Sequence, residues 1–248
     1  MPKISLTEIN EQAQLLTRVD RKYVLPIEVV SRLLIAIGES AQVLQVESNI
    51  AHLYKSTYFD TPELVSYHSA AFSRRRRFKV RARTYVDTGL SFIEVKTKGA
   101  NKQTVKERVA YAPKESTLSL QAVKYVDSIL RASNINSVNA AELKPVLTTE
   151  YKRTTLLLPL EGARATVDFN LRIEATGKIA LEFNDLAVVE TKSGSTPSSV
   201  DRLIWTMGYR QSKISKFGTG MAALYPDLPS NKWHRVLTQE LKIRESIK

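Results

Sequence analysis

Residues 78–85 alternate basic and apolar side chains, and this alternation constrains the fold more than any other feature of the sequence. Successive side chains of a β-strand point to opposite faces, so a strand here places Lys79, Arg81 and Arg83 on one face. The apolar residues between them then share the other face. A single strand of this kind is typical of any half-buried sheet, so the fold depends on whether other strands repeat the pattern.

Other segments of the chain repeat the alternation and also place charges on one face. Strands are predicted at residues 18–25, 54–60, 91–98, 104–110, 145–159, 164–169 and 187–192. The turn at residues 87–89 joins two of the strands as a hairpin. The charged residues of these further strands include Lys22, Glu94, Lys96, Lys106, Arg108, Arg153, Glu190 and Lys192, and Lys213 and Lys216 follow later in the chain.

Helical spacing of apolar residues predicts a helix in five further segments. These lie at residues 4–16, 27–37, 120–130, 200–207 and 233–241. Pro26 favours the start of the second helix and Gly38 its end. No linker is biased enough to divide the chain, so we expect one α+β domain over residues 1–248, with a C-terminal helical tail at 226–248.

The composition narrows the classes of ligand and site. Lys and Arg number 37 against 25 Asp and Glu, and the net charge of +12 attracts nucleic acid, anionic lipid or phosphorylated small molecules. The absence of cysteine excludes disulfides and thiolate metal sites, and three scattered His argue against a His-based zinc site. With no signal-like start and no apolar run of about 20 residues, we expect a soluble, cytoplasmic protein.

The repeated charged faces allow two interpretations. In an antiparallel sheet closed into a barrel, charged faces pointing inward would form a cationic cavity with a few carboxylates. Such a cavity needs an anionic partner such as a triphosphate or polyphosphate, and its carboxylates would suit Mg²⁺ or Mn²⁺. In the alternative, the charges face water and the apolar faces meet in an ordinary sandwich. Alternation alone leaves both interpretations open.

The order of short motifs resembles the polyphosphate polymerase domain of the vacuolar transporter chaperone (VTC) complex, which also occurs as a stand-alone bacterial domain. The matching pieces extend from about residue 18 to residue 220. They are Arg18-x-Asp20-x-Lys22-Tyr23, Tyr58-Phe-Asp-Thr61 with Tyr67, Lys79-x-Arg81-x-Arg83-x-Tyr85, Glu94-x-Lys96, Lys106-x-Arg108, Pro145 ahead of Tyr151-x-Arg153, Arg164-x-Thr166-x-Asp168, Glu190-x-Lys192 and Ser212-Lys213-x-x-Lys216-x-Gly218.

The resemblance implies a triphosphate tunnel metalloenzyme, related to the CYTH domains, with a closed eight-stranded antiparallel β-barrel and flanking helices. It implies ATP-dependent growth of inorganic polyphosphate with Mn²⁺ or Mg²⁺. By position, the resemblance assigns phosphate binding to Lys22, Arg81, Arg83, Lys96, Lys106, Arg153, Lys213 and Lys216, and metal binding to Glu190 first and Glu94 second. We expect Lys22, Arg81, Arg83 and Arg153 to be the catalytic residues, and Lys79, Arg108, Tyr151 and Lys192 to add phosphate contacts. For Tyr151, a place in the core is the alternative.

One departure from the wider superfamily bears on the reaction. Hydrolytic CYTH members begin with Glu-x-Glu-x-Lys, whereas this chain has Arg18, Asp20 and Lys22 at the corresponding positions. One carboxylate is thus replaced by a cation, which makes two metal ions harder to hold. The change favours polymerisation or polyphosphate binding over hydrolysis, and it leaves the metal role of Asp20 open.

Several functions compete at this point. A metal-dependent triphosphatase and a non-catalytic polyphosphate- or nucleotide-binding module are the alternatives to a polymerase. The expected partners are ATP and inorganic polyphosphate. No nucleic acid partner is expected, because no zinc finger or RNP-type strand occurs in the sequence. The eukaryotic complex couples synthesis to membrane translocation, so coupling here would need an unidentified membrane partner.

Overall fold

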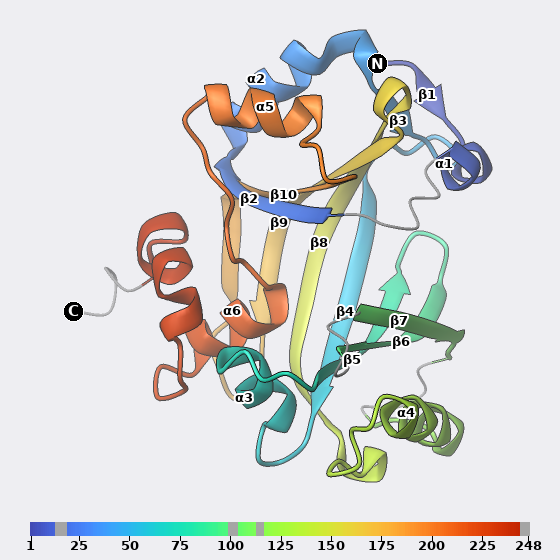
Figure 1. Cartoon of the computed structure of the whole chain (residues 1–248), viewed down its shortest axis with the longest axis vertical. Helices are drawn as coiled ribbons and strands as arrows, with labels where there is room; N and C mark the ends of the chain where they lie inside the picture. Colours follow the sequence, from blue (N-terminus) through green and yellow to red (C-terminus); the bar gives the residue numbers. More distant parts are fainter. Residues whose placement is uncertain (13–18, 99–103, 113–116, 244–248) are drawn as a thin grey trace. The chain divides into compact units, whose positions relative to one another are not determined.

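The computed structural model describes residues 1–12, 19–98, 104–112 and 117–243 (Figure 1). Arg18 and the last residues of the predicted N-terminal helix lie outside the described residues. The strands are β1 (Lys3–Ile4), β2 (Val19–Pro26), β3 (Gln42–Leu44), β4 (His52–Asp60), β5 (Arg77–Tyr85), β6 (Leu90–Lys98), β7 (Thr104–Ala110), β8 (Lys144–Leu158), β9 (Ala163–Glu174) and β10 (Leu181–Ser193).

These strands belong to one hydrogen-bonded sheet in the described part of the chain. Neighbours follow the order β2-β10-β9-β8-β4-β5-β6-β7, and β3 joins β1 to β8. The pairs β2–β10, β3–β8, β4–β5, β5–β6 and β6–β7 are antiparallel, whereas β1 and β3 are parallel. The predicted α+β class with a large antiparallel sheet is confirmed, and its closure into an eight-stranded barrel stays a prediction.

The helices agree with the sequence in part. They are α1 (Leu6–Gln12), α2 (Ile27–Ile37), α3 (Val65–Ala71), α4 (Leu120–Ala132), α5 (Ser199–Thr206) and α6 (Lys216–Leu224), with shorter turns η1 (Gly38–Ser40), η2 (Ala140–Glu142), η3 (Pro159–Glu161), η4 (Asn231–Trp233) and the π-helical η5 (Val236–Glu240). Helix α2 ends at Gly38, whose φ of 53° lies in the left-handed region that glycine tolerates. Helices α3 and α6 were not predicted, and η4 with η5 replaces the single C-terminal helix. No helix of the described residues is long and apolar enough to cross a membrane.

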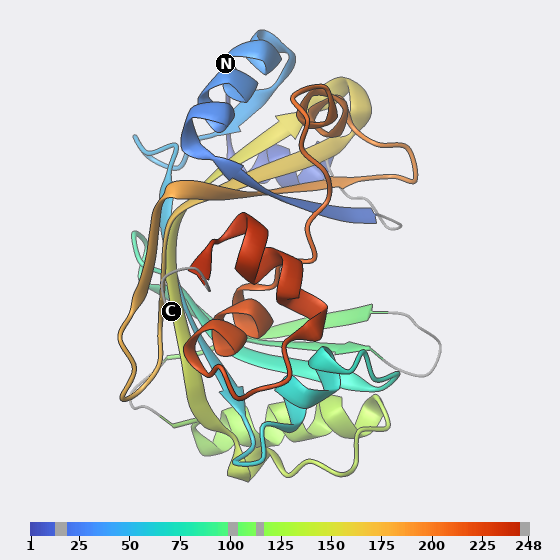
Figure 2. The same ribbon diagram turned by 90° about the vertical axis from the view of Figure 1, so that its left-hand side faces the viewer.

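The first of two compact units, unit 1, contains Met1–Leu53, Tyr151–Arg172 and Glu182–Ile214. Helices α2 and α5, blue and orange in Figure 2, lie side by side and cover one face of its strands. Tyr23 and Leu25 of β2 pack there with Val189 of β10 and with Leu33 and Ile204 of the helices. The alternate residues of β2 and β10 therefore point to the opposite face of the sheet.

The second unit, unit 2, contains Tyr54–Glu150, Ile173–Leu181 and Ser215–Lys248. Val80 and Ala82 of β5 are buried in one apolar cluster with Val126 and Leu130 of α4. The apolar face of β5 therefore packs against α4. The basic residues of the strand consequently lie on the face away from α4.

Candidate phosphate-binding sites

In unit 2 the strand register arranges the polar side chains of β4 to β7 into rows. Residues directly opposite each other in an antiparallel pair point to the same face of the sheet, so each row shares one face. We call the charged part of this face the unit 2 basic face. Its rows are Arg77 and Lys98; Lys79, Lys96 and Lys106; Tyr58, Arg81, Glu94 and Arg108; and Ser56, Arg83 and Phe92.

Glu94 is the buried carboxylate at the centre of the unit 2 basic face. Its Oε2 lies 2.5 Å from Arg81 Nη2, and its Oε1 lies 2.8 Å from Lys106 Nζ and 3.8 Å from Arg83 Nη1. Burial by itself would raise the pKa of Glu94, but the charges of Arg81, Arg83 and Lys106 outweigh burial and hold the pKa well below its usual range. Glu94 is therefore ionised at neutral pH, and three cations share it.

Aromatic rings hold the arginines of this face in place. The Arg81 guanidinium lies 5.8 Å from the Tyr58 ring centroid and donates a 3.2 Å hydrogen bond to the Tyr58 hydroxyl. The Arg83 guanidinium lies 5.5 Å from the centroid of the Tyr54 ring. Stacking fixes the plane of a guanidinium and leaves its edge directed at an acceptor. The Arg81 edge is directed at Glu94, whose Oε2 accepts a 2.7 Å hydrogen bond from Arg81 Nε, so a phosphate oxygen would compete with Glu94 for the Arg81 donors.

Lys79, in the same basic face, is oriented by the N-terminus of α6. Its Nζ donates a 2.9 Å hydrogen bond to Ser215 Oγ, and that oxygen also accepts from the backbone N–H of Gly218 at 3.1 Å. Trp233 packs so closely on Gly218 that an added Cβ would lie 2.1 Å from the indole ring. Glycine is therefore required at residue 218. Lys216, predicted to bind phosphate, is the first residue of α6 and is half-buried.

In unit 1 the paired strands β2 and β10 carry opposite charges in register. Lys22 lies opposite Glu190, and Asp20 lies opposite Lys192. Lys192 Nζ is 2.5 Å from Glu190 Oε1 and 3.9 Å from Asp20 Oδ2, and Lys22 Nζ is 3.9 Å from Glu190 Oε2. Cross-strand pairs of opposite charge stabilise a sheet. We call these residues, with Arg153, the unit 1 charge cluster.

The pKa of Glu190 depends on the same two opposing effects as the pKa of Glu94, namely burial and nearby cations. Burial by itself would raise its pKa, but Lys22, Lys192 and Arg153 outweigh burial and hold the pKa of Glu190 well below its usual range. The Glu190 side chain is 17% exposed, compared with 3% for Glu94. Of the two glutamates, Glu190 is therefore the more accessible to a ligand.

Arg153, on β8, makes a two-point contact with a buried carboxylate. Its Nε and Nη2 donate to the two oxygens of Asp168 at 2.5 and 2.7 Å. Its guanidinium lies 5.3 Å from the centroid of the buried Tyr151 ring. Two of the donor nitrogens of Arg153 are therefore already engaged. The sequence did not predict Asp168 as the partner, because the two residues come from different strands.

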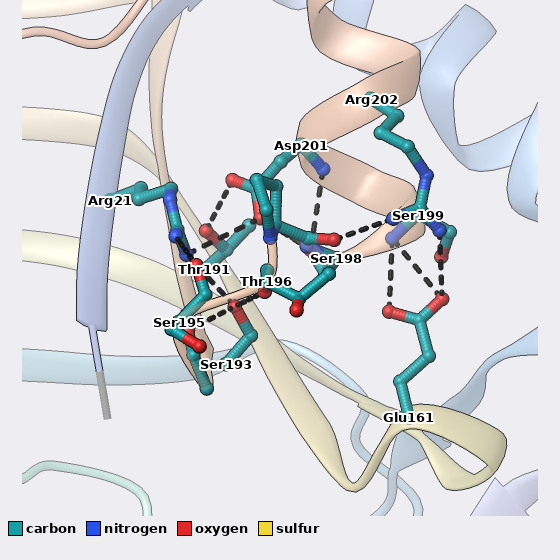
Figure 3. A network of polar contacts seen from close by, with 12 residues as sticks. Arg21, Glu161, Thr191, Ser193, Ser195, Thr196, Ser198, Ser199, Asp201 and Arg202 are labelled. Carbon is teal, nitrogen blue, oxygen red and sulfur yellow. Dashed lines mark hydrogen bonds and ion pairs between the residues drawn. The ribbon is translucent and has the colours of Figure 1, made fainter. Parts of the chain in front are cut away.

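A buried polar network lies on the helix-facing side of β2 and β10, and sequence reasoning missed it (Figure 3). Asp201 is fully buried at the start of α5, and it accepts hydrogen bonds from the Tyr23 hydroxyl at 2.7 Å and from Thr191 Oγ1 at 2.6 Å. Its other oxygen accepts from the backbone N–H and hydroxyl of Ser198. The network therefore ties α5 to β2 and β10, two of the strands that carry the unit 1 charge cluster.

Two residues next to Lys22 in sequence belong to this network. Arg21 donates to Ser193 Oγ at 2.9 Å and to the carbonyl oxygen of Ser195 at 2.8 Å (Figure 3). Burial and the hydrogen bond to Asp201 raise the pKa of Tyr23 above its usual range, so its hydroxyl stays a donor. The Ser198-x-x-Asp201 spacing of a capping box was the sequence signal that could have found this network.

Asp60 anchors α3 at the end of β4 in unit 2. Its carboxylate accepts three backbone hydrogen bonds of 2.8 Å, from Thr61, Ser66 and Tyr67. Burial raises the pKa of Asp60 to about 6, although these three bonds act to lower it. Asp60 belongs to the Tyr58-Phe-Asp-Thr61 motif, and the structure gives it a role in positioning α3.

Two further predicted phosphate ligands, Lys213 and Arg108, are exposed to solvent. Lys213 is exposed in the segment between α5 and α6. Arg108 is exposed on β7, and its guanidinium lies 4.9 Å from the centroid of the Phe92 ring. The structure thus brings Arg81, Arg83 and Lys106 together around Glu94, whereas Arg108 is stacked on an aromatic ring.

The carboxylates differ in how well they would suit a divalent metal. Among the described residues, no group of three or more His, Cys, Asp or Glu side chains is close enough to hold a metal ion. Mg²⁺ at phosphate sites commonly takes one or two carboxylates, with water and phosphate oxygens completing its coordination. Glu190, partly exposed and on the same face as Asp20, suits such a shared site. The three cations around Glu94 favour ion pairing there.

Comparison with solved structures supports the fold. A protein from Bacillus halodurans, proposed to be an adenylate cyclase, is 15% identical with a TM-score of 0.50, covering 80% of this chain and 94% of its own. A proposed adenylyl cyclase from Hippeastrum, described as having a dominant triphosphatase activity, is 16% identical with a TM-score of 0.51, covering 87% and 99%. At these identities the likeness shows a shared fold.

Comparison with curated proteins gave no match. Comparison with protein families matched the VTC domain over residues 17–225. The matched range contains both the unit 1 charge cluster and the unit 2 basic face. The chain belongs to the VTC domain family.

Proposed function

We propose that the chain is an ATP-dependent inorganic polyphosphate polymerase. The observation that carries the proposal is the unit 2 basic face, where Arg81, Arg83 and Lys106 share the buried carboxylate of Glu94. Lys96 lies directly opposite Lys106, and Lys106 shares Glu94 with two arginines, so the cations on this face outnumber its buried carboxylate. A chain of phosphates supplies negative charge along its length and suits successive rows of cations.

In the proposed reaction, a terminal oxygen of the polyphosphate chain attacks the γ-phosphorus of ATP. A new P–O bond forms to the chain, the bond from the γ-phosphorus to the β–γ bridging oxygen breaks, and ADP leaves with that electron pair. Phosphoryl transfer depends mainly on positioning and charge neutralisation. Arg81 and Arg83, held in place by Tyr58 and Tyr54, would stabilise charge on the transferred group, whose oxygens would share their donors with Glu94.

Within unit 1, the candidate phosphate ligands of the charge cluster are Lys22, Lys192 and Arg153. Lys192 and Arg153 are now paired with carboxylates, so binding requires phosphate oxygens to compete for their donors. Bound Mn²⁺ or Mg²⁺, held by Glu190 together with phosphate oxygens, would supply further neutralisation of the phosphate charge.

The test is chain growth by the purified full chain from ATP with Mn²⁺ or Mg²⁺, with and without a short polyphosphate primer, followed on gels. The Arg81→Ala, Arg83→Ala double variant should lower the rate at least about a thousandfold, because an arginine that stabilises transferred phosphate contributes that much. Arg131→Ala is the matched control, since Arg131 is exposed on α4 and paired with Asp127. If the wild-type chain makes no polyphosphate under any of these conditions, the proposal fails.

A metal-dependent triphosphatase is the second candidate. The observation in its favour is that Asp20 and Glu190 share one face of the β2–β10 pair, where two carboxylates could take part in metal binding. The Hippeastrum protein that shares the fold is described as having a dominant triphosphatase activity. Phosphate release without elongation would select this candidate, and tight polyphosphate binding without turnover would select a non-catalytic binding module.

A further inference from the structure

The face that carries the basic rows ends in aromatic side chains. Tyr54 lies opposite Tyr85 across β4 and β5, and Phe92 lies opposite Arg83 across β5 and β6. The ring centroids of Tyr54 and Tyr85 are 4.9 Å apart, and those of Tyr85 and Phe92 are 5.9 Å apart at 88°. We call these three rings the aromatic end. It continues the unit 2 basic face along the strands.

The three rings have different environments. Tyr54 is buried and supports both Tyr85 and the Arg83 guanidinium. Tyr85 and Phe92 are half-buried, so part of each ring is accessible. Arg108 covers Phe92 with its guanidinium at 4.9 Å from the ring centroid. The accessible ring of Tyr85 is thus bordered by a second ring and a stacked cation.

Charge and aromatic character change along β5 in one direction. Lys79, Arg81, Arg83 and Tyr85 follow one another on the same face. At about 3.3 Å per residue, Arg81 and Tyr85 are roughly 13 Å apart along the strand, and Lys79 lies about 7 Å beyond Arg81. A nucleoside triphosphate has the same polarity, with anionic phosphates at one end and an aromatic base at the other.

We propose that the aromatic end binds the nucleobase of the nucleoside triphosphate donor, with Tyr85 as its stacking surface. This inference rests on the proposed function and deepens it by orienting the donor. With the base on Tyr85, the phosphates lie over Arg83 and Arg81. The γ-phosphate then points toward the row of Lys79, Lys96 and Lys106, which takes the acceptor chain.

The chemistry of the aromatic end suits a base better than it suits more phosphate. Base–aromatic stacking tolerates different bases because every base has a π-face, and a nearby arginine adds a cation–π contribution. Inorganic triphosphate has no group that can use Tyr85. The aromatic end therefore distinguishes ATP from inorganic triphosphate.

The test compares the binding of ATP and of inorganic tripolyphosphate to the full chain by calorimetry, in EDTA so that metal-dependent turnover is suppressed. Tyr85→Ala should weaken ATP binding about tenfold or more, as expected for the loss of one base–aromatic stack. The same variant should leave tripolyphosphate binding unchanged, and Tyr85→Phe should bind both like the wild type. Phe72→Ala is the matched control, because Phe72 is an exposed ring near Arg74 that follows α3 outside the sheet.

Two results would overturn the inference. Equal loss of ATP and tripolyphosphate affinity would mean that Tyr85 supports the basic face and contacts no base. Unchanged ATP affinity in Tyr85→Ala would mean that the nucleoside lies elsewhere. Failure of the wild-type chain to polymerise would refute the proposed function while leaving a selective loss of ATP binding as support for the nucleobase site.

Discussion

The unit 1 charge cluster and the unit 2 basic face use similar residues in opposite arrangements. In unit 1, Lys22 lies opposite Glu190 and Lys192 lies opposite Asp20, so the strands place unlike charges together. In unit 2, Lys96 lies between Lys79 and Lys106, so the strands place like charges together. Like charges in register destabilise a sheet, and unlike charges stabilise it. An anionic ligand should therefore stabilise unit 2 more than unit 1.

The two regions also differ in how the opposite side of their strands is packed. The apolar face of β5 in unit 2 packs on α4 through residues such as Val80 and Val126. The helix-facing side of β2 and β10 in unit 1 adds a buried polar network, with Asp201 as its centre (Figure 3). Apolar packing holds its face through contact area, whereas hydrogen bonds to a buried carboxylate also fix the relative position of its donors.

The largest effect on stability should come from removing the carboxylate that the basic face shares. Glu94→Gln leaves Arg81, Arg83 and Lys106 without their common counter-charge, and should lower the free energy of unfolding by about 3 kcal/mol. Polyphosphate at about a hundred times its dissociation constant should restore about 2.7 kcal/mol of stability. Urea denaturation with and without polyphosphate measures both changes.

Glu190→Gln is the comparison for Glu94→Gln. Its effect should be smaller, because Lys22 and Lys192 are 36% and 25% exposed and Asp20 remains near Lys192. An equal loss of stability in the two variants would contradict the difference between the units. So would a Glu94→Gln protein whose stability does not respond to polyphosphate.

The next effect concerns acid stability. Glu94 and Glu190 both have pKa values held below their usual range, because nearby cations outweigh burial. The unfolded chain, with glutamate pKa values of about 4.3, takes up protons first as the pH falls. Stability from these groups is therefore present above about pH 4.5 and decreases below it. Denaturation curves between pH 5 and 3 should show this decrease, and it should be smaller in Glu94→Gln.

Asp60 should act in the opposite direction over a different pH range. Its pKa is raised to about 6 by burial, so the folded chain holds a proton that the unfolded chain has lost between about pH 4 and 6. The contribution of Asp60 to stability therefore decreases as the pH rises through that range. Asp60→Asn should remove this slope while leaving the decrease below about pH 4.5, and an unchanged slope would show that Asp60 does not titrate there.

The smallest predicted effect is the loss of polyphosphate affinity when a single lysine is replaced in either region. Lys96→Gln should weaken polyphosphate binding about threefold to tenfold and make binding less dependent on salt, because one phosphate contact is lost. Lys192→Gln should have a smaller effect, since Lys192 must leave Glu190, 2.5 Å away, before it can bind phosphate. Lys124→Gln, on the exposed side of α4, controls for net charge. Titrations at several salt concentrations measure all three, and equal effects would remove the distinction between the regions.

Much of the secondary structure followed from local patterns. The alternation at residues 78–85 predicted β5 within one residue, and the apolar spacing after Pro26 predicted α2. Helix α6 was missed because Gly218 and Gly220 lower helix propensity. The reason for Gly218 is the close approach of Trp233, which follows α6 in the chain and belongs to the C-terminal turns.

The candidate residues were predicted better than their partners. Arg81 and Arg83 were expected on one face, and the structure places both beside Glu94. Glu94 was expected as the second metal ligand, and the structure surrounds it with cations from β5 and β7. Asp201 was missed because its burial and its donors on β2 and β10 depend on how α5 packs.

By itself, the sequence determined which side chains share a face, because the two-residue period of a strand is a local property of the backbone. The order of its short motifs also indicated the VTC domain family, since each motif is a local run of residue types. Only the tertiary structure decided which charges lie opposite one another, because register depends on contacts between strands that are distant in sequence. That register separates the balanced pair of Lys22 and Glu190 from the crowded lysines around Lys96.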